Sequence, residues 1–320
     1  MQLTIEVRRA GVVEATHPCS AVMVERGQAV FAVGMDISSY WRSACKPFQL
    51  VTSLAHLDAD WVDALDPCDL AIGAASHSGQ PSHVLRVRAL LAQLGLREEQ
   101  LQCGAHAPMH EPSARCIIMY QNAMSNCSGK HTFMLAACVR EKWPLDYRSP
   151  EHPLQRANRL ILDTMANVSH GVGVDGCSIP TFHAPLSGQA LAWSRLASAM
   201  GAGEPSAGSS AESRLGRVGW AMHHHPFFMS GTGRLDLAVV RAAGEPLTVK
   251  IGAEGLFCIA RPNAQQGIAV KVHSGSSEAL APAVRAVLER LGVPLAGELP
   301  GEKVFNVRGV HVGERLATWG

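Results

Sequence analysis

The chain has 320 residues, of which 47% are hydrophobic and 17% charged, and its formal net charge at pH 7 is +1. This balance is that of an ordinary globular protein, and it excludes a basic nucleic-acid-binding stripe and an acidic tail. No run reaches the roughly 18 apolar residues of a membrane span, and the N-terminus alternates like a strand instead of a secretory leader. Nine cysteines, an odd number, indicate reduced thiols. We therefore expect a cytoplasmic protein without nucleic-acid or membrane partners.

The expected elements run from strands through helices and back to strands. Period-two patterns predict strands at 2–8, 20–25 and 28–34, and later at 247–251, 255–260 and 267–272. Helical periodicity predicts helices at 44–56, 82–95, 129–141, 153–168, 188–200, 211–225 and 277–292. Short apolar runs at 69–74 and 116–119 predict buried strands, and the Gly/Ser/Pro-rich segment 201–210 predicts a surface loop. The chain is thus expected to be one α/β or α+β unit over 1–320, with strands from both chain ends in one sheet.

Ser43 and Lys46 stand one helical turn apart, where the 44–56 helix is expected to begin. Residues at i and i+3 share a helix face, so the lysine amine can reach the serine hydroxyl and take its proton. With Ser43 as N-cap, Pro47 falls within the first turn, where proline is tolerated. In the alternative interpretation Ser43 only caps the helix and Lys46 lies in solvent.

Two later segments offer further serine and lysine side chains. Ser76, His77 and Ser78 follow the expected strand 69–74, a place where α/β folds put functional loops. A polar turn with Ser82 capping the next helix is the alternative. Lys250 precedes a glycine that permits close backbone approach, so it could present an ammonium to a carboxylate or a serine. Otherwise it is a solvated lysine at a strand end.

Cysteines stand in two glycine-bearing segments. Cys127, Lys130 and His131 occur where the 129–141 helix begins, and Asp175 and Cys177 lie in a turn-rich loop. Thiolates and imidazoles are usual zinc ligands, whereas lysine coordinates only when neutral. The chemistry of these residues alone leaves open that both cysteines are small buried hydrophobes.

Taken in order, these clusters resemble the L-asparaginase II family of the rhizobial type. The motifs that carry the resemblance are Ser43-x-x-Lys46, Ser76-His-Ser78-Gly79, Asn126-Cys127-Ser128-Gly129-Lys130-His131, Asp175-Gly176-Cys177 and Lys250-x-Gly252. The resemblance implies hydrolysis of L-asparagine to L-aspartate and ammonia. It also implies a fold similar to serine β-lactamases and penicillin-binding proteins, with a helical lobe against an antiparallel sheet built from both chain ends.

The same resemblance implies a role for each motif. Ser43 would be the nucleophile with Lys46 as its base, and Ser76 with Lys250 would form a second Ser–Lys pair. Asp175 would bind the α-ammonium of the substrate, with Arg42 and His131 lining the pocket. Zinc, as a structural or affinity-tuning element, would be bound by Cys127, Lys130 and Cys177, with water completing the tetrahedron.

Three residues depart from the family pattern, namely Cys45, Gln80 and Ile251. None of them removes a catalytic group, but they leave substrate preference and rate open. Two rival interpretations remain: a penicillin-recognising serine enzyme, which shares S-x-x-K and K-x-G, and a non-catalytic zinc-dependent binding protein. A homodimer is the default expectation for the assembly.

Overall fold

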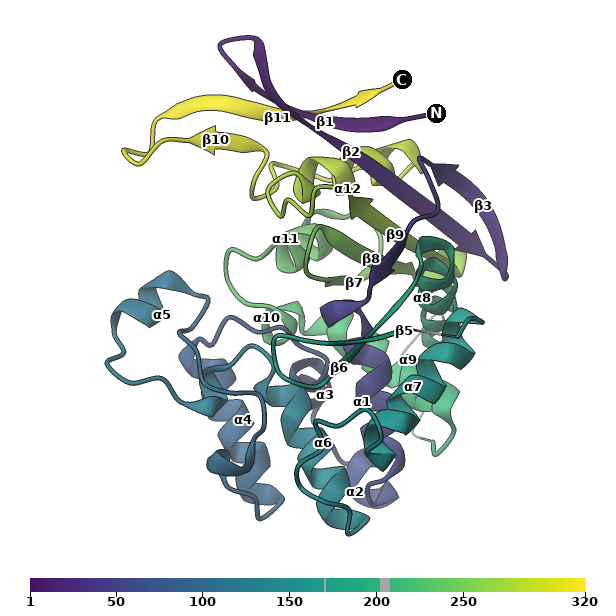
Figure 1. The fold of residues 1–320 in the computed structure, drawn as a ribbon, viewed down its shortest axis with the longest axis vertical. Helices are drawn as coiled ribbons and strands as arrows, with labels where there is room; N and C mark the ends of the chain where they lie inside the picture. Colours follow the sequence, from purple (N-terminus) through teal and green to yellow (C-terminus); the bar gives the residue numbers. More distant parts are fainter. Residues whose placement is uncertain (170, 202–207) are drawn as a thin grey trace.

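The computed structural model describes residues 1–169, 171–201 and 208–320, and it is a mixed α/β structure (Figure 1). Its described part contains an eight-stranded antiparallel sheet in the order β10-β11-β1-β2-β9-β8-β7, with β3 paired to β2. The strands are β1 (Leu3–Arg9), β2 (Val12–Glu25), β3 (Gln28–Val33), β7 (Thr248–Ile251), β8 (Leu256–Arg261), β9 (Gln266–Val272), β10 (Lys303–Phe305) and β11 (His311–Trp319). The expectation that strands from both chain ends share one sheet is confirmed.

The long strand β2 joins the two halves of the sheet. Its Cys19 lies opposite Leu3 of β1 on one side and opposite Val272 of β9 on the other. The first half of β2 is mostly exposed and its second half is mostly buried. The β10, β11 and β1 end of the sheet accordingly extends beyond the helical part, as the top of Figure 1 shows. The buried half, together with β7, β8 and β9, forms the apolar side of the core that positions the site.

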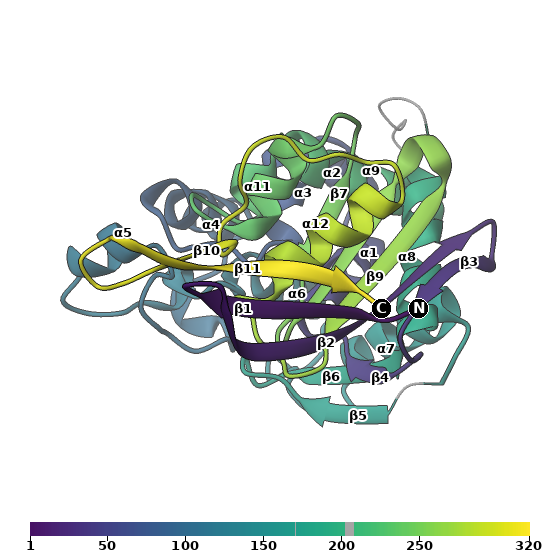
Figure 2. The same cartoon turned by 90° about the horizontal axis from the view of Figure 1, so that it is seen from above.

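Helices pack against this core and against one another. Helix α8 (Leu186–Met200) lies on β2, β8 and β9, and α1 (Lys46–Ala55) packs against α6, α7 and α9. Figure 2 shows α12 and α8 beside β9. The remaining helices are α2 (Ala59–Asp63), α3 (Pro67–Gly73), α4 (Pro81–Gln93), α5 (Glu111–Arg115), α6 (Ser128–Arg140), α7 (Pro153–Ala166), α9 (Ala211–His224), α10 (Pro226–Met229), α11 (Leu235–Ala242) and α12 (Leu280–Arg290).

A small second sheet has the order β4-β6-β5. Its strands are β4 (Ser38–Tyr40), β5 (Gly171–Val174) and β6 (Pro180–Pro185), and short 3-10 turns occur at η1 (Arg42–Cys45), η2 (Glu98–Gln100), η3 (Asn122–Met124) and η4 (Pro262–Ala264). Within the described ranges, none of the helices is both long and apolar enough to span a membrane.

Two predicted strands are wrong. Residues 69–74 belong mainly to α3, because Asp66 caps that helix by accepting from Cys68 N at 2.7 Å and Pro67 begins it. Periodicity alone cannot separate a short buried strand from a short buried helix. Residues 116–119 form a largely exposed loop. Most of the expected loop 201–210 lies outside the described residues.

Two predicted caps are also wrong. Ser43 lies inside η1, and the N-cap of α1 is Cys45. The N-cap of helix α4 is Gln80 instead of Ser82, two residues earlier than expected, because Pro81 begins the helix. The remaining predicted helices and strands are present with ends that differ by a few residues, except that β2 begins at Val12, eight residues before the predicted start at residue 20.

Candidate active site

A cavity of about 380 Å³ lies where η1, the loop after α3 and the β7–β8 turn meet. Both predicted serines line it: Ser43 is half-buried on η1, and Ser76 is buried in the loop after α3. The other lining residues are Met109, Asn126, Arg234, Ile251, Gly252, Ala253, Glu254, Gly255, Gly275, Ser277 and Leu280. The fold therefore brings together two hydroxyl groups that are 33 positions apart in the chain.

Lys46 is fully buried, and its amine faces the loop after α3. Its Nζ donates to Ser76 Oγ at 2.9 Å and to the carbonyl oxygens of Ala75 at 2.6 Å and Asn126 at 3.4 Å. In the part of the chain that the structure describes, Lys46 makes no hydrogen bond to Ser43. The hydrogen bonding thus pairs Lys46 with Ser76, because Ser43 lies in the 3-10 turn before α1 and not in the first turn of that helix.

Lys250, on β7, is the second predicted lysine and is also fully buried. Its Nζ lies 3.6 Å from Asp236 Oδ1 and donates to the Ile251 carbonyl oxygen at 3.3 Å. Burial lowers the pKa of Lys250 to about 8; the Asp236 carboxylate opposes this shift, and the charges of Lys46 and Arg234 reinforce it. No hydrogen bond joins Lys250 to Ser76 among the described residues, so the predicted second pair is not formed here by direct contact.

Cys127, Lys130 and Cys177 converge in the interior, as the resemblance implies. Cys127 is the N-cap of α6, Lys130 lies in its first turn, and Cys177 lies between β5 and β6. Lys130 Nζ donates to Cys177 Sγ at 3.3 Å. A hydrogen bond from the Cys177 thiol lowers the pKa of Cys127, whereas the same contact raises that of Cys177. Burial alone would lower the pKa of Lys130, but the two cysteine sulfurs raise it.

This donor set suits zinc, because two thiolates and one neutral amine can occupy three tetrahedral positions, and a bound ion would displace the thiol and ammonium protons. Among the described residues there is no group of three or more His, Cys, Asp or Glu side chains that could hold a metal. Gly129, between two of these residues, allows α6 to approach α3, since a Cβ there would lie 2.2 Å from the Ile72 carbonyl oxygen.

Arg42 and Asp175 form an ion pair beside the cavity. Arg42 Nε donates to Asp175 Oδ1 at 2.6 Å, and Arg42 has a left-handed backbone with φ +46°. Burial raises the pKa of Asp175, but Lys130 and Arg42 lower it by more, so the carboxyl ends below its usual range. Non-glycine residues in this region store strain of about 1–3 kcal/mol and often occur at functional sites. Neither residue is part of the cavity lining itself.

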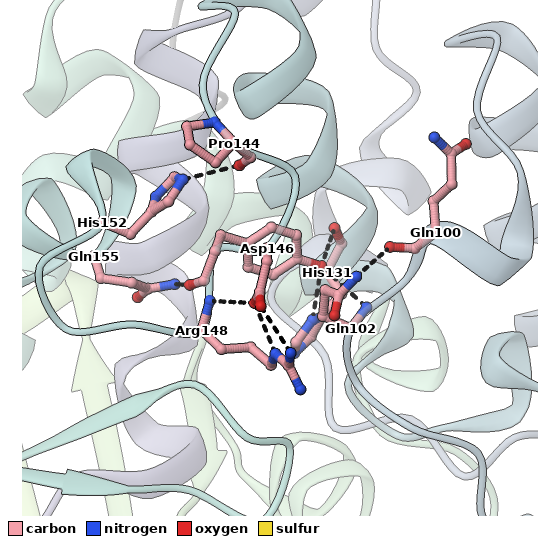
Figure 3. Close-up of polar contacts among 9 residues, drawn as sticks. Gln100, Gln102, His131, Pro144, Asp146, Arg148, His152 and Gln155 are labelled. Carbon is pink, nitrogen blue, oxygen red and sulfur yellow. Dashed lines mark hydrogen bonds and ion pairs between the residues drawn. The ribbon is translucent and has the colours of Figure 1, made fainter.

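His131, expected to line the pocket, is buried elsewhere. Figure 3 shows its ring beside the segment from Pro144 to Gln155. Its Nδ1 lies 3.0 Å from Tyr147 Oη, which also accepts from Gln102 N at 3.4 Å. His131 is not among the residues that line the cavity. His131 therefore lies outside this cavity, and its expected contact with substrate stays a prediction.

Sequence reasoning missed Arg234 and Asp236. Arg234 lines the cavity, and Asp236 lies against Lys250. Both occur at the start of α11, a short helix that the periodicity did not predict. The glycines of Gly231-Thr-Gly233 just before them were the available signal, because paired glycines mark a tight turn that can bring side chains to a site.

Comparison with known proteins places these observations in a family. No curated protein matches the chain. A solved structure described as Mglu in its native form is 15% identical to this chain, with a TM-score of 0.47. The match covers 87% of this chain and 66% of the Mglu chain. Mglu in its L-glutamate binding form in 4.3 M NaCl is 14% identical, with a TM-score of 0.39 and coverages of 88% and 61%. The chain thus spans less than two thirds of the solved structures it matches.

The family comparison covers nearly the whole chain. The model described as L-asparaginase II matches residues 5–316, which include every motif and cavity residue named above. The chain belongs to the L-asparaginase II family.

Proposed function

We propose that this protein is an amidohydrolase that converts L-asparagine and water to L-aspartate and ammonia. The observation that carries the proposal is a cavity lined by Ser43 and Ser76, with the buried Lys46 amine bonded to Ser76, in a chain of the L-asparaginase II family. Family membership favours amide hydrolysis over both rivals, the penicillin-recognising enzyme and the non-catalytic zinc-binding protein.

In the proposed reaction Ser43 Oγ attacks the side-chain amide carbon of asparagine. The step requires Lys46 as a neutral amine, to which Ser76 donates, so that the Lys46–Ser76 hydrogen bond has the opposite direction. The Ser43 proton then passes to the Ser76 oxygen while the Ser76 proton passes to the Lys46 nitrogen. The C–N bond then breaks, and the leaving nitrogen takes a proton from the same relay to depart as ammonia. Water hydrolyses the resulting aspartyl ester and regenerates the Ser43 hydroxyl.

Lys250 is proposed to act beside this relay, as a positive charge when protonated and as a proton acceptor when neutral. Its amine is buried with a pKa near 8, so both protonation states are accessible close to neutral pH. Asp175 is proposed to bind the α-ammonium of the substrate, which requires a partial exchange of its present bond to Arg42. These roles rest on the resemblance and on the nearness of the two side chains to the cavity.

Zinc is proposed to be bound by Cys127, Lys130 and Cys177, whose side chains converge as a fitting donor set. When bound, the ion supplies positive charge and fixes ligand orientation; it is not the source of the nucleophile. These three residues tie the start of α6 to the β5–β6 loop, which carries Asp175 two residues from Cys177. The site would therefore hold Asp175 in place.

The fold relation, the domain organisation, the location and the partners are also proposals. The sheet from both chain ends against a helical lobe supports a relation to the serine β-lactamase fold. The family match across 5–316 supports one domain over 1–320. The protein is proposed to work in the cytoplasm as a homodimer, without nucleic-acid or membrane partners.

The first test is ammonia release from L-asparagine by the purified protein, beside L-glutamine, with and without added zinc. Release from asparagine well above release from glutamine supports the proposed substrate. Equal or faster release from glutamine would support an amidohydrolase whose preferred substrate is not L-asparagine. No release from either amide by the folded, zinc-supplied protein contradicts the proposed function.

A further inference from the structure

Arg234 is the cationic side chain of the cavity lining. Among the lining residues it carries the one positive charge, and Glu254 carries the one negative charge. Arg234 Nε is buried and has no hydrogen-bond partner among the described residues. A guanidinium keeps its charge at all physiological pH values, and a buried donor without an acceptor is costly. An anionic group in the cavity would satisfy it.

The segment before Arg234 is fastened to the loop that carries Ser76. Ser76 N donates to the Met229 carbonyl oxygen at 3.1 Å, and Ser78 Oγ donates to the Ser230 carbonyl oxygen at 2.7 Å. Gln80 accepts from Thr232 N at 2.8 Å and donates to Thr232 Oγ1 at 3.2 Å. These bonds give Gln80, one of the departures from the family pattern, a positioning role.

The segment after Arg234 is fastened to the opposite wall of the cavity. Asp236 Oδ1 accepts from Ile251 N at 2.7 Å, and Ile251 itself lines the cavity. Arg234 is thus held between the Ser76 loop on one side and the β7–β8 turn on the other. Its place relative to the reacting serines is set by hydrogen bonds on both sides and not by a free loop.

The two buried lysines near the cavity already have partners. Lys46 donates to Ser76, and Lys250 lies beside Asp236. Arg234, in contrast, makes no ion pair within the described ranges. A planar guanidinium presents paired donors that match both oxygens of a carboxylate.

We propose that Arg234 binds the α-carboxylate of the amino-acid substrate and so orients the side-chain amide toward Ser43. This inference rests on the proposed function, because it takes the substrate to be an α-amino acid. Binding of the product is measured as well as turnover, so that a wrong inference about Arg234 can be distinguished from a wrong proposed function.

The direct test compares two ligands by calorimetry. L-Aspartate carries the α-carboxylate, and L-isoasparagine has a neutral amide in its place while keeping the ammonium and the side-chain carboxylate. The parent protein should bind L-aspartate more tightly, and Arg234→Gln should remove most of this preference, roughly a ten- to hundredfold effect by the usual strength of charged hydrogen bonds. Arg234→Lys, which keeps the charge near Lys250 but not the paired donors, should retain part of it.

Arg241→Gln is the matched control, because Arg241 is exposed and lies in the last turn of the same helix. It should keep the preference of the parent protein, and the unfolding midpoints of all variants should be compared. For turnover, kcat/KM on L-asparagine should fall roughly ten- to hundredfold in Arg234→Gln and stay unchanged in Arg241→Gln.

Each outcome is decisive. If Arg234→Gln lowers the affinity for L-aspartate and L-isoasparagine by the same factor, its effect is structural and the inference is overturned. An unchanged preference overturns it as well. If the parent protein releases no ammonia but Arg234→Gln still abolishes the preference for L-aspartate, the proposed function fails while the carboxylate site stands.

Discussion

Lys46 Nζ donates to Ser76 Oγ at 2.9 Å, although Ser43 is the serine that stands three residues before Lys46 in the chain. Both serines line one cavity, whereas Lys46 is fully buried behind them. The lysine thus reaches the cavity through the Ser76 hydroxyl. This relationship assigns separate roles to the two serines, and each role can be tested.

Replacing Ser76 by alanine should slow turnover without removing the nucleophile. We expect kcat to fall by about 10²–10⁴, the usual contribution of a positioned acid–base group. Steady-state ammonia release measures this. Ser82→Ala is the control, because Ser82 is exposed on α4 and is not part of the cavity lining. Full activity of Ser76→Ala would remove the relay from the mechanism.

Lys46→Met should abolish activity, because the relay then lacks its final proton acceptor. Lys46→Arg keeps the positive charge but cannot act as a base at neutral pH, and it should be nearly as inactive. Ammonia release and unfolding midpoints are measured together, so that loss of folding is not mistaken for loss of catalysis. An active Lys46→Arg variant would show that charge, and not proton transfer, is what this side chain supplies.

The pKa of Lys250 predicts the pH dependence of the rate. If the neutral amine is the active form, kcat/KM should rise as pH increases through about 8, where the ammonium loses its proton. The carboxylate of Asp236 raises that pKa, so Asp236→Asn should move the rise to lower pH. Asp236→Glu keeps the charge and should leave it near its original position. If the rise in kcat/KM occurs at the same pH in Asp236→Asn as in the parent protein, the pH dependence does not come from Lys250.

Zinc binding should depend on Cys177. Cys177→Ser should lower zinc affinity at least tenfold, because a serine hydroxyl is a poorer ligand than a thiolate for this ion. Cys138→Ala is the control, since Cys138 is buried on helix α6 but is not one of the three proposed ligands. Competition with a chromogenic chelator measures the affinity. Equal zinc affinity in Cys177→Ser and the parent protein would exclude this donor set.

Gly231 should be required for the turn that carries Arg234. Its φ is +112°, and a Cβ there would lie 2.5 Å from Ser78 Oγ. Gly231→Ala should therefore lower the free energy of unfolding by about 1–3 kcal/mol and reduce activity. Gly233→Ala has φ +75° and no atom within 4 Å of the new Cβ, so it should cost less. Chemical denaturation compares the two; an equal cost would show that the contact with Ser78 is unimportant.

The sequence predicted the parts of the fold that have a clear period. The predicted strands within 2–34 and 247–272, and long helices such as α7 and α9, have apolar patterns with a clear period, whereas β10 and β11 near the C-terminus were not predicted. The prediction of a strand at 69–74 was wrong because a short, mostly apolar run of six residues fits a strand and a helix equally well. The N-cap Asp66 and Pro67 at the first helical position favoured the helix. Small strands such as β5, which contains two glycines, carry no recognisable period.

The sequence predicted which motifs belong to the candidate site, but it did not predict most of the contacts between their side chains. The convergence of Cys127, Lys130 and Cys177, and the shared cavity of Ser43 and Ser76, follow the family pattern. Which lysine touches which serine could not be predicted, because it depends on the 3-10 turn at η1 and on the burial of Lys46. Arg234 was missed because its place is set by bonds to the Ser76 loop that are distant in sequence.

The central claim is that Ser43 forms a covalent ester with the acyl group of asparagine. Reaction with L-asparagine, quenched rapidly in acid and followed by peptide mass spectrometry, tests it most directly. We expect an aspartyl adduct on the Ser43 peptide in the parent protein, and neither adduct nor ammonia from Ser43→Ala. Ammonia release by Ser43→Ala at the parent rate, or an adduct on Ser76 instead, would contradict the account.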